Sequence, residues 1–264
     1  MNNIALIISY DGTYYFGWQK TISGPTIEET LTSVLSRLLQ ENIVLQAASR
    51  TDKGVHAEGQ VINFFTHKKI DVNKLQYSLN CLLPKDIHVL SCQKMDLSFH
   101  PTIDCIKKEY HYYLFYGKFL SPFLLPFVWH YPYPINLKKL KKAAEQCIGE
   151  KDFSSFCNET VNDGKRIIFH LEIEEIKKDF LRIKCIGDNF LYKMIRILVG
   201  TLAQISCNKI LLSMEEIIQK KERKKAGITA PSSGLFLHKI HYSEKKILNK
   251  ISLYSFVDFL FSTN

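Results

Sequence analysis

The sequence lacks any apolar run that approaches the roughly 18 residues of a membrane-spanning helix. Its first apolar stretch, Ile4 to Tyr10, also lacks the basic flank and the small-residue cleavage site of a signal peptide. Internal sequence repeats and low-complexity segments are missing as well. With 46% hydrophobic residues among 264, the chain can bury a large core. We therefore expect a soluble, cytoplasmic protein of one large domain or two modest ones.

Cysteines at metal-binding spacing are also absent. The seven cysteines are odd in number and widely spaced, and no two form a Cys-x-x-Cys pair. This pattern argues against a structural zinc site and against a disulfide framework. His56 and His111 likewise have no partners at ligand spacing. We predict reduced thiols and no bound metal.

Acidic residues are the minority among the charged side chains. The chain has 35 Lys and Arg against 26 Asp and Glu, which gives a formal net charge of +9. Such an excess favours polyanionic partners or an acidic membrane surface. The lysines gather in four clusters, at 68–69, 107–108, 138–142 and 220–225. Each cluster could be no more than a solvated surface, but their sum fits phosphate contacts on a structured RNA.

The first half of the chain, residues 1–105, has the pattern of a β-α-β-β-α-β unit. Thr26 and Glu29 form a capping-box signature at the start of a helix whose apolar residues recur every three or four positions up to Leu39. Strands are expected at 4–10, 61–65 and 87–90, with a further apolar run at 43–45, and a second helix is expected at 73–82.

The second half, residues 106–264, begins with an aromatic-rich strand at Tyr110–Tyr116. It continues with a helix capped by Asn136, a hairpin of strands at 169–173 and 181–185, a helix at 190–205, and a final helix that begins at Ser213 and runs through the basic cluster to Gly227. We predict a mixed α/β (α+β) protein of two fused halves. Each half is a mostly antiparallel sheet backed by helices, with a basic active-site cleft between them.

The polar segment 48–57 lies between two apolar, strand-like runs, a setting that favours functional groups. Asp52 within this segment has two interpretations, one structural and one catalytic. An aspartate before Gly54 is a common turn former that binds its own backbone. Alternatively, its carboxylate acts as nucleophile or base on a nucleotide sugar, where an anion stabilises or captures the oxocarbenium character that develops at C1′.

A catalytic carboxylate must stay ionised, which calls for a neighbouring cation. Burial raises a carboxylate pKa by up to roughly 3 to 5 units, whereas an adjacent arginine lowers it by about 1 to 3. Arg50 and Arg196 are both candidates, although Arg196 could equally be a surface residue of an amphipathic helix. Tyr110 could stack on a base or simply fill a sheet core.

The segment Arg50-Thr-Asp-Lys-Gly-Val-His-Ala57, followed by a glutamine, resembles the active-site loop of the tRNA pseudouridine synthase A family. Four further segments resemble motifs of that family: Tyr10 to Gln19, Asp152 to Phe156, Gly187 to Leu202 and Ala230 to Leu235. Some residues depart from the family pattern, among them Ser49, Thr102 and Asp188. Ser49 stands where the family has glycine, Thr102 where it has arginine, and Asp188 where it has asparagine.

The resemblance implies a cofactor-independent isomerase that converts uridine to pseudouridine at positions 38, 39 and 40 of the tRNA anticodon stem-loop. It implies that Asp52 is the nucleophile and that Arg196 forms its ion pair. Arg50 would work beside the flipped-out nucleotide, and Tyr110 would stack on the base and take part in proton transfer. Leu237 would complete the pocket wall. The family is dimeric, so the resemblance also implies a homodimer that binds one tRNA across both subunits, with no metal, nucleotide cofactor or membrane.

Three other functions fit the residues less fully. In a non-catalytic RNA-binding protein, Asp52 would be structural. A different nucleoside-modifying or glycosidic enzyme would use the same carboxylate on another base. A membrane-surface protein would bind through the basic run, but that run lacks a large apolar face.

Overall fold

The computed structural model describes residues 1–160, 162–243 and 257. The chain forms two compact units. The first is Met1–Ile106 together with the last described strand from Phe236 onward, and the second includes Lys107–Leu235. The sequence places everything after residue 105 in the second half. The structure differs in returning the last described strand to the first unit, because that strand binds β3 rather than ending the second half.

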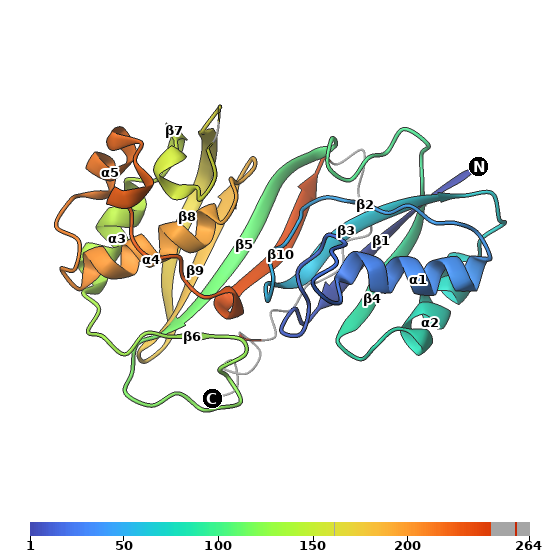
Figure 1. Cartoon of the computed structure of the whole chain (residues 1–264), viewed down its shortest axis with the longest axis horizontal. Helices are drawn as coiled ribbons and strands as arrows, with labels where there is room; N and C mark the ends of the chain where they lie inside the picture. Colours follow the sequence, from blue (N-terminus) through green and yellow to red (C-terminus); the bar gives the residue numbers. More distant parts are fainter. Residues whose placement is uncertain (161, 244–256, 258–264) are drawn as a thin grey trace. The chain divides into compact units, whose positions relative to one another are not determined.

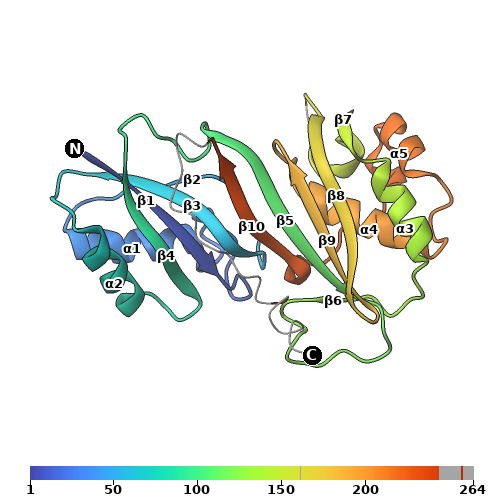
Figure 2. The same cartoon turned by 180° about the vertical axis from the view of Figure 1, so that it is seen from behind.

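The first unit is a sheet with two helices on one face (Figures 1 and 2). Its elements are β1 (Asn2–Tyr10), α1 (Ile27–Leu39), β2 (Gln46–Ala47), β3 (His56–Thr66), α2 (Val72–Leu82), β4 (Ile87–Met95) and β10 (Leu235–Tyr242). The strand order is β4-β1-β3-β10, and β2 also pairs with β3. All of these pairs are antiparallel except β3 with β10, where Phe236 and Leu237 lie opposite His56 and Ala57.

Helix α1 forms where the sequence predicts it. Thr26 is fully buried, and its hydroxyl accepts a hydrogen bond from the Glu29 N–H at 3.3 Å, which satisfies one of the unpaired donors of the first turn. The reciprocal half of the predicted capping box is replaced, since the Glu29 carboxylate pairs with Lys20 instead. The apolar face of α1 is buried at Ile27, Leu31, Val34, Leu35 and Leu39.

The second unit is also an antiparallel sheet with helices. Its elements are β5 (Cys105–Phe115), β6 (Trp129–His130), α3 (Leu137–Glu145), β7 (Gly149–Asp152), β8 (Lys165–Lys177), β9 (Phe180–Gly187), α4 (Met194–Ser206) and α5 (Met214–Lys220), with short 3-10 turns at Ser154–Phe156, Arg223–Lys225 and Ser232–Gly234. The strand order is β5-β9-β8-β7, and β6 adds a short parallel pair to β5. The predicted hairpin is confirmed as β8 and β9. The mixed α/β class is therefore confirmed.

The predicted final helix is wrong beyond Lys220. Ser213 and Glu216 form the capping box as predicted, but the helix ends at Lys221, which has a left-handed backbone with φ of 53°. Arg223 then turns inward. Its guanidinium donates to Asn158 at 2.7 Å and to the Gly227 carbonyl at 2.8 Å. These two bonds stabilise a 3-10 turn in place of a continued helix.

Two further helices are shorter than their patterns predict. The helix capped by Asn136 ends at Glu145, before Ile148. Helix α4 begins at Met194 rather than at Phe190, because Lys193 has a left-handed backbone with φ of 59°. Among the described residues, no helix combines the length and the apolarity needed to cross a membrane. All seven cysteines lie in the described part of the chain, and none of them forms a disulfide bond there.

Candidate active site

Asp52 lies in the turn that joins β2 to β3 in the first unit. Its backbone carbonyl accepts a hydrogen bond from the Val55 N–H at 3.1 Å, and Gly54 supplies the positive φ of 75° that the turn requires. The Asp52 side chain is half-buried, whereas Arg50 is exposed. The main chain therefore makes this turn, and the turn holds a carboxylate at the end of a rigid strand.

The loop after β1, residues 11–18, supports the Asp52 turn along its length. The Trp18 N–H donates to the Thr51 carbonyl at 2.9 Å, and the Gly54 N–H donates to the Tyr15 carbonyl at 3.2 Å. The Tyr10 hydroxyl bonds the Thr51 hydroxyl at 2.8 Å in a buried position. Two segments that are far apart in the sequence thus form one hydrogen-bonded structure.

Two glycines allow the loops to approach so closely. A Cβ atom at Gly17 would lie 2.6 Å from the Thr51 carbonyl oxygen and 3.0 Å from the Asp52 carbonyl carbon. Gly17 also has a φ of 96°, which residues with side chains rarely adopt. A Cβ atom at Gly12 would overlap the Val55 carbonyl. Both glycines of the Asp-Gly-Thr and Gly-Trp-Gln pattern are therefore required by the backbone of the Asp52 turn.

His56 and Asp11 form a polar contact beside the turn. The His56 ring is buried and stacks on Phe236 with centroids 4.6 Å apart. Its Nδ1 lies 3.1 Å from the Asp11 carboxylate and 3.1 Å from the Gly12 nitrogen. It therefore donates to Asp11 when protonated and accepts from the Gly12 N–H when it is not. Burial opposes ionisation of Asp11, but hydrogen bonds from His56 and Thr13 outweigh burial and lower the pKa of Asp11 from 3.8 to about 2.

Replacing Asp11 by asparagine should therefore weaken folding in a pH-dependent way. Because the folded-state pKa of Asp11 is lowered, its contribution is present above about pH 4 and is lost as pH falls towards 2. With allowance for the exposed part of this side chain, the loss in unfolding free energy should be about 1 to 2 kcal/mol at pH 6. Urea titrations of parent and variant at pH 6, 4 and 3 should show the difference shrinking below pH 4. The exposed Asp96, changed to asparagine, serves as control, and a difference independent of pH would contradict the assignment.

Gln60 anchors the start of the Asp52 segment from β3. Its buried side-chain amide accepts from the Ser49 N–H at 3.3 Å and donates to the Ser49 carbonyl at 2.5 Å. The Thr102 hydroxyl donates to the Ala47 carbonyl at 2.7 Å, two residues earlier. Ser49 and Thr102, which depart from the family pattern, therefore both lie in the support of this loop. Thr102 uses its hydroxyl to fix the backbone.

Replacing Gln60 by leucine should lower the free energy of unfolding by about 2 to 6 kcal/mol. Each of the two Ser49 backbone groups would lose its buried partner, at about 1 to 3 kcal/mol apiece. Urea unfolding monitored by circular dichroism measures the change. Gln93 provides the matched leucine control, because among the described residues its amide bonds only the Ser91 hydroxyl, and its loss should cost less than about 1 kcal/mol. Equal losses at the two sites would contradict the anchoring role of Gln60.

Arg196 lies in the first turn of α4 in the second unit, and its direction is fixed by the segment 230–235. The Arg196 Nε donates to the Ala230 carbonyl at 2.8 Å, and the Ala230 N–H donates back to the Arg196 carbonyl at 3.0 Å. This pair of bonds links two of the family-like motifs. It also explains why an arginine is needed, since Nε binds the backbone while the same planar group carries two further nitrogens.

The Val-Gly-Thr-Leu stretch of α4 holds the same segment. A Cβ atom at Gly200 would overlap the Ile228 carbonyl, so the helix requires a residue without a side chain at this position. The Thr201 hydroxyl donates to Ile197 at 2.7 Å and accepts from the Gly227 N–H at 2.8 Å. The loop that receives Arg196 is thus fixed to the helix that carries it.

Asp188, which stands in place of an asparagine, acts as a hydrogen-bond acceptor. One carboxylate oxygen accepts from the Ile167 N–H at 2.9 Å and from the Asn189 N–H at 2.6 Å. An asparagine side-chain oxygen can accept both bonds in the same way. The departure at Asp188 therefore preserves the local geometry at the end of β9.

Tyr110 lies on β5, opposite Cys185 of β9, and is buried. Its ring meets Phe190 edge to face with centroids 5.4 Å apart. Two positions along β5, the Tyr112 hydroxyl donates to the Pro231 carbonyl at 2.8 Å, and burial raises the pKa of Tyr112 well above its ordinary value. Tyr112 therefore acts as a neutral hydrogen-bond donor to the segment that receives Arg196. Sequence reasoning missed this role.

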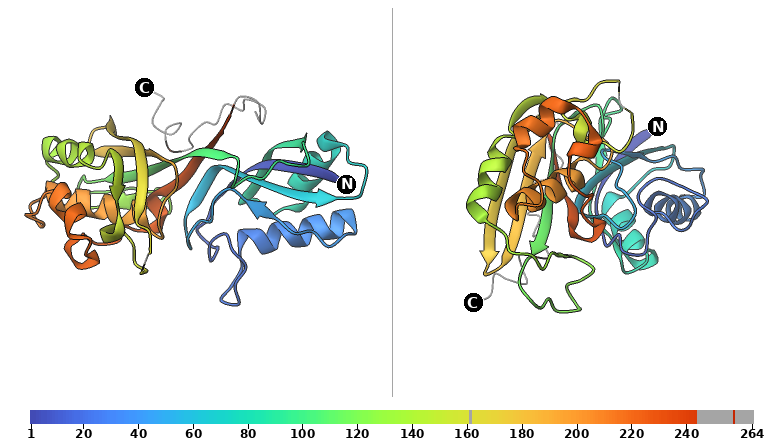
Figure 3. Two further views of the ribbon diagram at one scale, coloured as in Figure 1. Left: turned by 90° about the horizontal axis from the view of Figure 1, so that it is seen from above. Right: turned by 60° about the vertical axis from the view of Figure 1, so that its left-hand side comes forward.

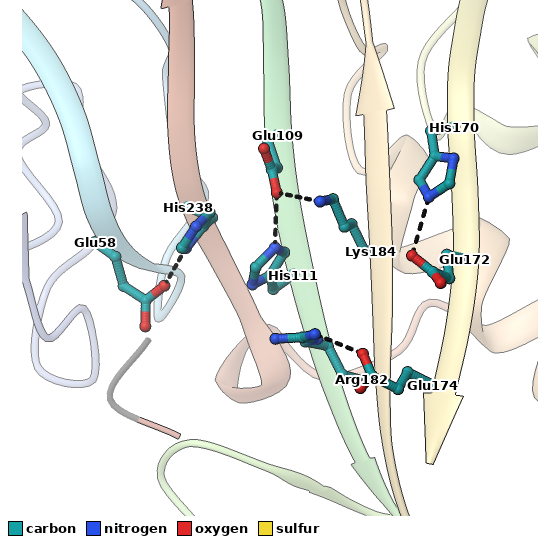
Figure 4. A network of polar contacts seen from close by, with 9 residues as sticks. All are labelled: Glu58, Glu109, His111, His170, Glu172, Glu174, Arg182, Lys184 and His238. Atoms are coloured by element: carbon teal, nitrogen blue, oxygen red, sulfur yellow. Dashed lines mark hydrogen bonds and ion pairs between the residues drawn. The ribbon is translucent and has the colours of Figure 1, made fainter. Parts of the chain in front are cut away.

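Buried ionisable residues accompany the site in both units (Figure 4). In the second unit, Glu109 bonds His111 at 3.0 Å and pairs with Lys184 at 3.1 Å. In the first unit, His238 of β10 lies 2.7 Å from Glu58 of β3. Leu237, on the same strand, is fully buried. The family resemblance indicated Leu237 on this strand. Nothing in the sequence predicted the contact between Glu58 and His238.

Sequence similarity to known proteins extends over most of the chain. A family model described as tRNA pseudouridine synthase matches residues 6–103 and 143–243, which include Asp52, Arg50, Arg196 and Leu237 but not Tyr110. The chain is 49% identical over 250 residues to tRNA pseudouridine synthase A 2 of Protochlamydia amoebophila (strain UWE25), covering 92% of this chain and 95% of that protein. It is 41% identical over 245 residues to tRNA pseudouridine synthase A of Thermoanaerobacter sp. (strain X514), covering 92% of this chain and all of that protein.

The chain therefore belongs to the tRNA pseudouridine synthase family. This makes it an isomerase that acts on tRNA. A solved structure titled as a Cbf5-Nop10-Gar1 complex aligns with 76% of this chain and 44% of that one, at 10% identity and a TM-score of 0.38, a likeness too weak to bear on the argument.

Proposed function

We propose that this protein isomerises uridine to pseudouridine at positions 38, 39 and 40 of the tRNA anticodon stem-loop. Asp52 detaches uracil from C1′ of the ribose, the base rotates within the pocket, and C5 joins C1′ as C5 loses its proton. Asp52 either attacks C1′ or removes the C2′ proton to give a glycal. The isomerisation is redox-neutral and draws on no external energy source, so the chemistry requires neither a metal nor a nucleotide cofactor.

The observation that carries this proposal is the support of the Asp52 turn. Its backbone is bonded from the loop after β1, and the segment just before it is anchored by Gln60. A carboxylate on such a rigid support suits a reaction that needs an anion at a fixed place beside C1′. The turn lies within a segment that the family model matches.

The other residues that the family resemblance indicates have roles in the same proposal. Arg196 forms the ion pair that keeps Asp52 ionised when the substrate excludes water. Arg50, whose side chain is exposed, holds the stem open beside the flipped nucleotide. Tyr110 stacks on the target base and takes part in proton transfer, and Leu237 completes the pocket wall. The bonds between Arg196 and Ala230 support this assignment, because they set the direction of the guanidinium before any substrate binds.

We further propose that the protein works in the cytoplasm as a homodimer that binds one tRNA across both subunits. The net charge of +9 favours such a polyanionic partner. Light scattering at working concentration tests the oligomeric state, and a monomeric mass would count against the dimer.

Tritium release tests the reaction itself. Transfer RNA labelled at C5 of uridine loses tritium to water only if C5 forms the new bond. Site mapping should place the product at positions 38 to 40. Release of free uracil, or product at other positions, would instead favour a different nucleoside-modifying enzyme. Binding without release would favour a non-catalytic RNA-binding protein.

A further inference from the structure

Tyr14 differs from the other aromatic residues of the loop after β1. Tyr15 and Trp18 are at most 5% exposed and Phe16 is half-buried, whereas Tyr14 is 78% exposed. The residues on either side of Tyr14 are held in place by hydrogen bonds. The Thr13 N–H donates to Asp11 at 2.9 Å, and the Tyr15 hydroxyl donates to Asp86 at 2.8 Å. Within the part of the chain that the structure describes, the Tyr14 side chain makes no hydrogen bond and no ring contact, so a fixed backbone presents a bare aromatic ring to solvent.

Tyr14 is also close to the Asp52 turn. The next residue, Tyr15, accepts a hydrogen bond from Gly54 through its carbonyl, and Gly12, two residues earlier, touches Val55. Consecutive Cα atoms are about 3.8 Å apart, so the Tyr14 backbone is held between two contacts with the turn. In the left view of Figure 3, the blue loop between β1 and α1 projects beyond the helix.

Cations are exposed in the Asp52 turn that this loop supports. The Lys53 ammonium, one residue after Asp52, lies 3.7 Å from the centroid of the Phe16 ring, and its side chain is exposed. Arg50 is exposed two residues before Asp52. Exposed aromatic rings combined with Lys and Arg are what single-stranded nucleic acid requires, since bases stack on the rings and phosphates bind the cations. An apolar protein partner would be poorly matched by these two charges.

We propose that Tyr14 stacks on an unpaired base of the tRNA next to the uridine that is isomerised. The inference rests on the proposed function and adds a positioning residue to it. Taking a uridine out of a stem breaks its stacking with its neighbours. The Tyr14 ring replaces part of that stacking on the neighbouring base, which holds the opened stem against the Asp52 turn.

Replacing Tyr14 by alanine should raise the KM for tRNA about 5- to 150-fold, the range expected for one base stacked on an aromatic ring. The value of kcat should change less than about two-fold, because Tyr14 touches no reacting atom. Phenylalanine at position 14 should preserve KM, and leucine should behave as alanine does. Tyr77 of α2, 74% exposed in the same unit, is the matched control, and its change to alanine should leave KM unaltered.

A fluorescent base reads the stacking directly and without catalysis. The probe is an anticodon stem-loop with 2-aminopurine next to the target uridine. The parent and the Tyr14→Phe protein should quench the fluorescence of the bound probe, whereas the Tyr14→Ala protein should not. Equal quenching by the Tyr14→Ala protein, or an equal rise in KM for the Tyr77 control, would overturn the proposal. If the parent released no tritium, the proposed function would fail, while the fluorescence of the bound stem-loop would still decide whether Tyr14 stacks.

Discussion

The Asp52→Asn protein should release tritium from C5-labelled tRNA at least about 10³-fold more slowly than the parent, in line with the loss of a group that acts directly on the reacting atoms. Asparagine has the shape of aspartate and can still accept hydrogen bonds, but it carries no charge. It can neither capture C1′ nor act as a base at C2′. The backbone bonds of the turn, which come from Trp18, Val55 and Gly54, do not involve the carboxylate and should survive the change.

Asp188 provides the matched control for this experiment. The Asp188→Asn change is chemically the same, and it leaves an oxygen that can accept from Ile167 and Asn189. Its kcat/KM should stay within about three-fold of the parent, because the local hydrogen bonds are retained. Binding of tRNA by both variants, measured by filter binding, should match the parent. An Asp52→Asn protein that kept a tenth of the parent rate would show that the carboxylate is not the reacting group.

Replacing Gly17 by alanine should lower kcat/KM about 10²-fold while the protein stays folded. The new methyl group would lie 2.6 Å from the Thr51 carbonyl oxygen, so the Asp52 turn must move to admit it. A displacement of about 1 Å at a reacting group is enough for a loss of that size. Single-turnover tritium release at saturating enzyme separates the slowed reaction from weaker binding.

Gly149 separates displacement of the turn from backbone strain. It has a φ of 100°, close to the 96° of Gly17, but a Cβ atom there would meet nothing within 4 Å. Both alanine variants therefore carry a similar strain, of about 1 to 3 kcal/mol in unfolding free energy. Only the Gly17 variant should lose activity. Equal activity in the two variants would mean that the loop after β1 does not set the position of Asp52.

Local patterns in the sequence predict most of the elements, because their causes are local. Helix α1 needs only Thr26 and an apolar residue every three or four positions. The predicted helix through the basic cluster fails for a non-local reason. Arg223 binds Asn158, which lies 65 residues earlier and has no visible relation to it in the sequence. The position of β10 in the first unit also has a non-local cause, because β10 pairs with β3, which is far from it in the sequence.

The residues of the candidate site also fall into two groups, those that sequence motifs indicate and those whose role depends on non-local contacts. The motifs led to Asp52, Arg50, Arg196, Tyr110 and Leu237, and their roles stay predictions. The residues that support the site were not found, because the purpose of each depends on a contact across the fold. The side chain of Gln60 reaches back eleven residues to Ser49, and the close approach that requires Gly17 comes from Thr51, which is far from it in the sequence. A glutamine that follows the Asp52 motif was visible in the sequence, but its partner was not.

The path of the chain also sets the order in which the protein can be completed during synthesis. Because the ribosome makes the N-terminal end first, Met1–Ile106 emerges long before the strand that binds β3. Phe236, which stacks on His56, and His238, which pairs with Glu58, are made only after Lys107–Leu235 of the second unit. The edge of β3 next to the Asp52 turn thus stays unpaired on the nascent chain. The sheet beside the Asp52 turn can therefore be completed only late in synthesis, when the last described strand pairs with β3.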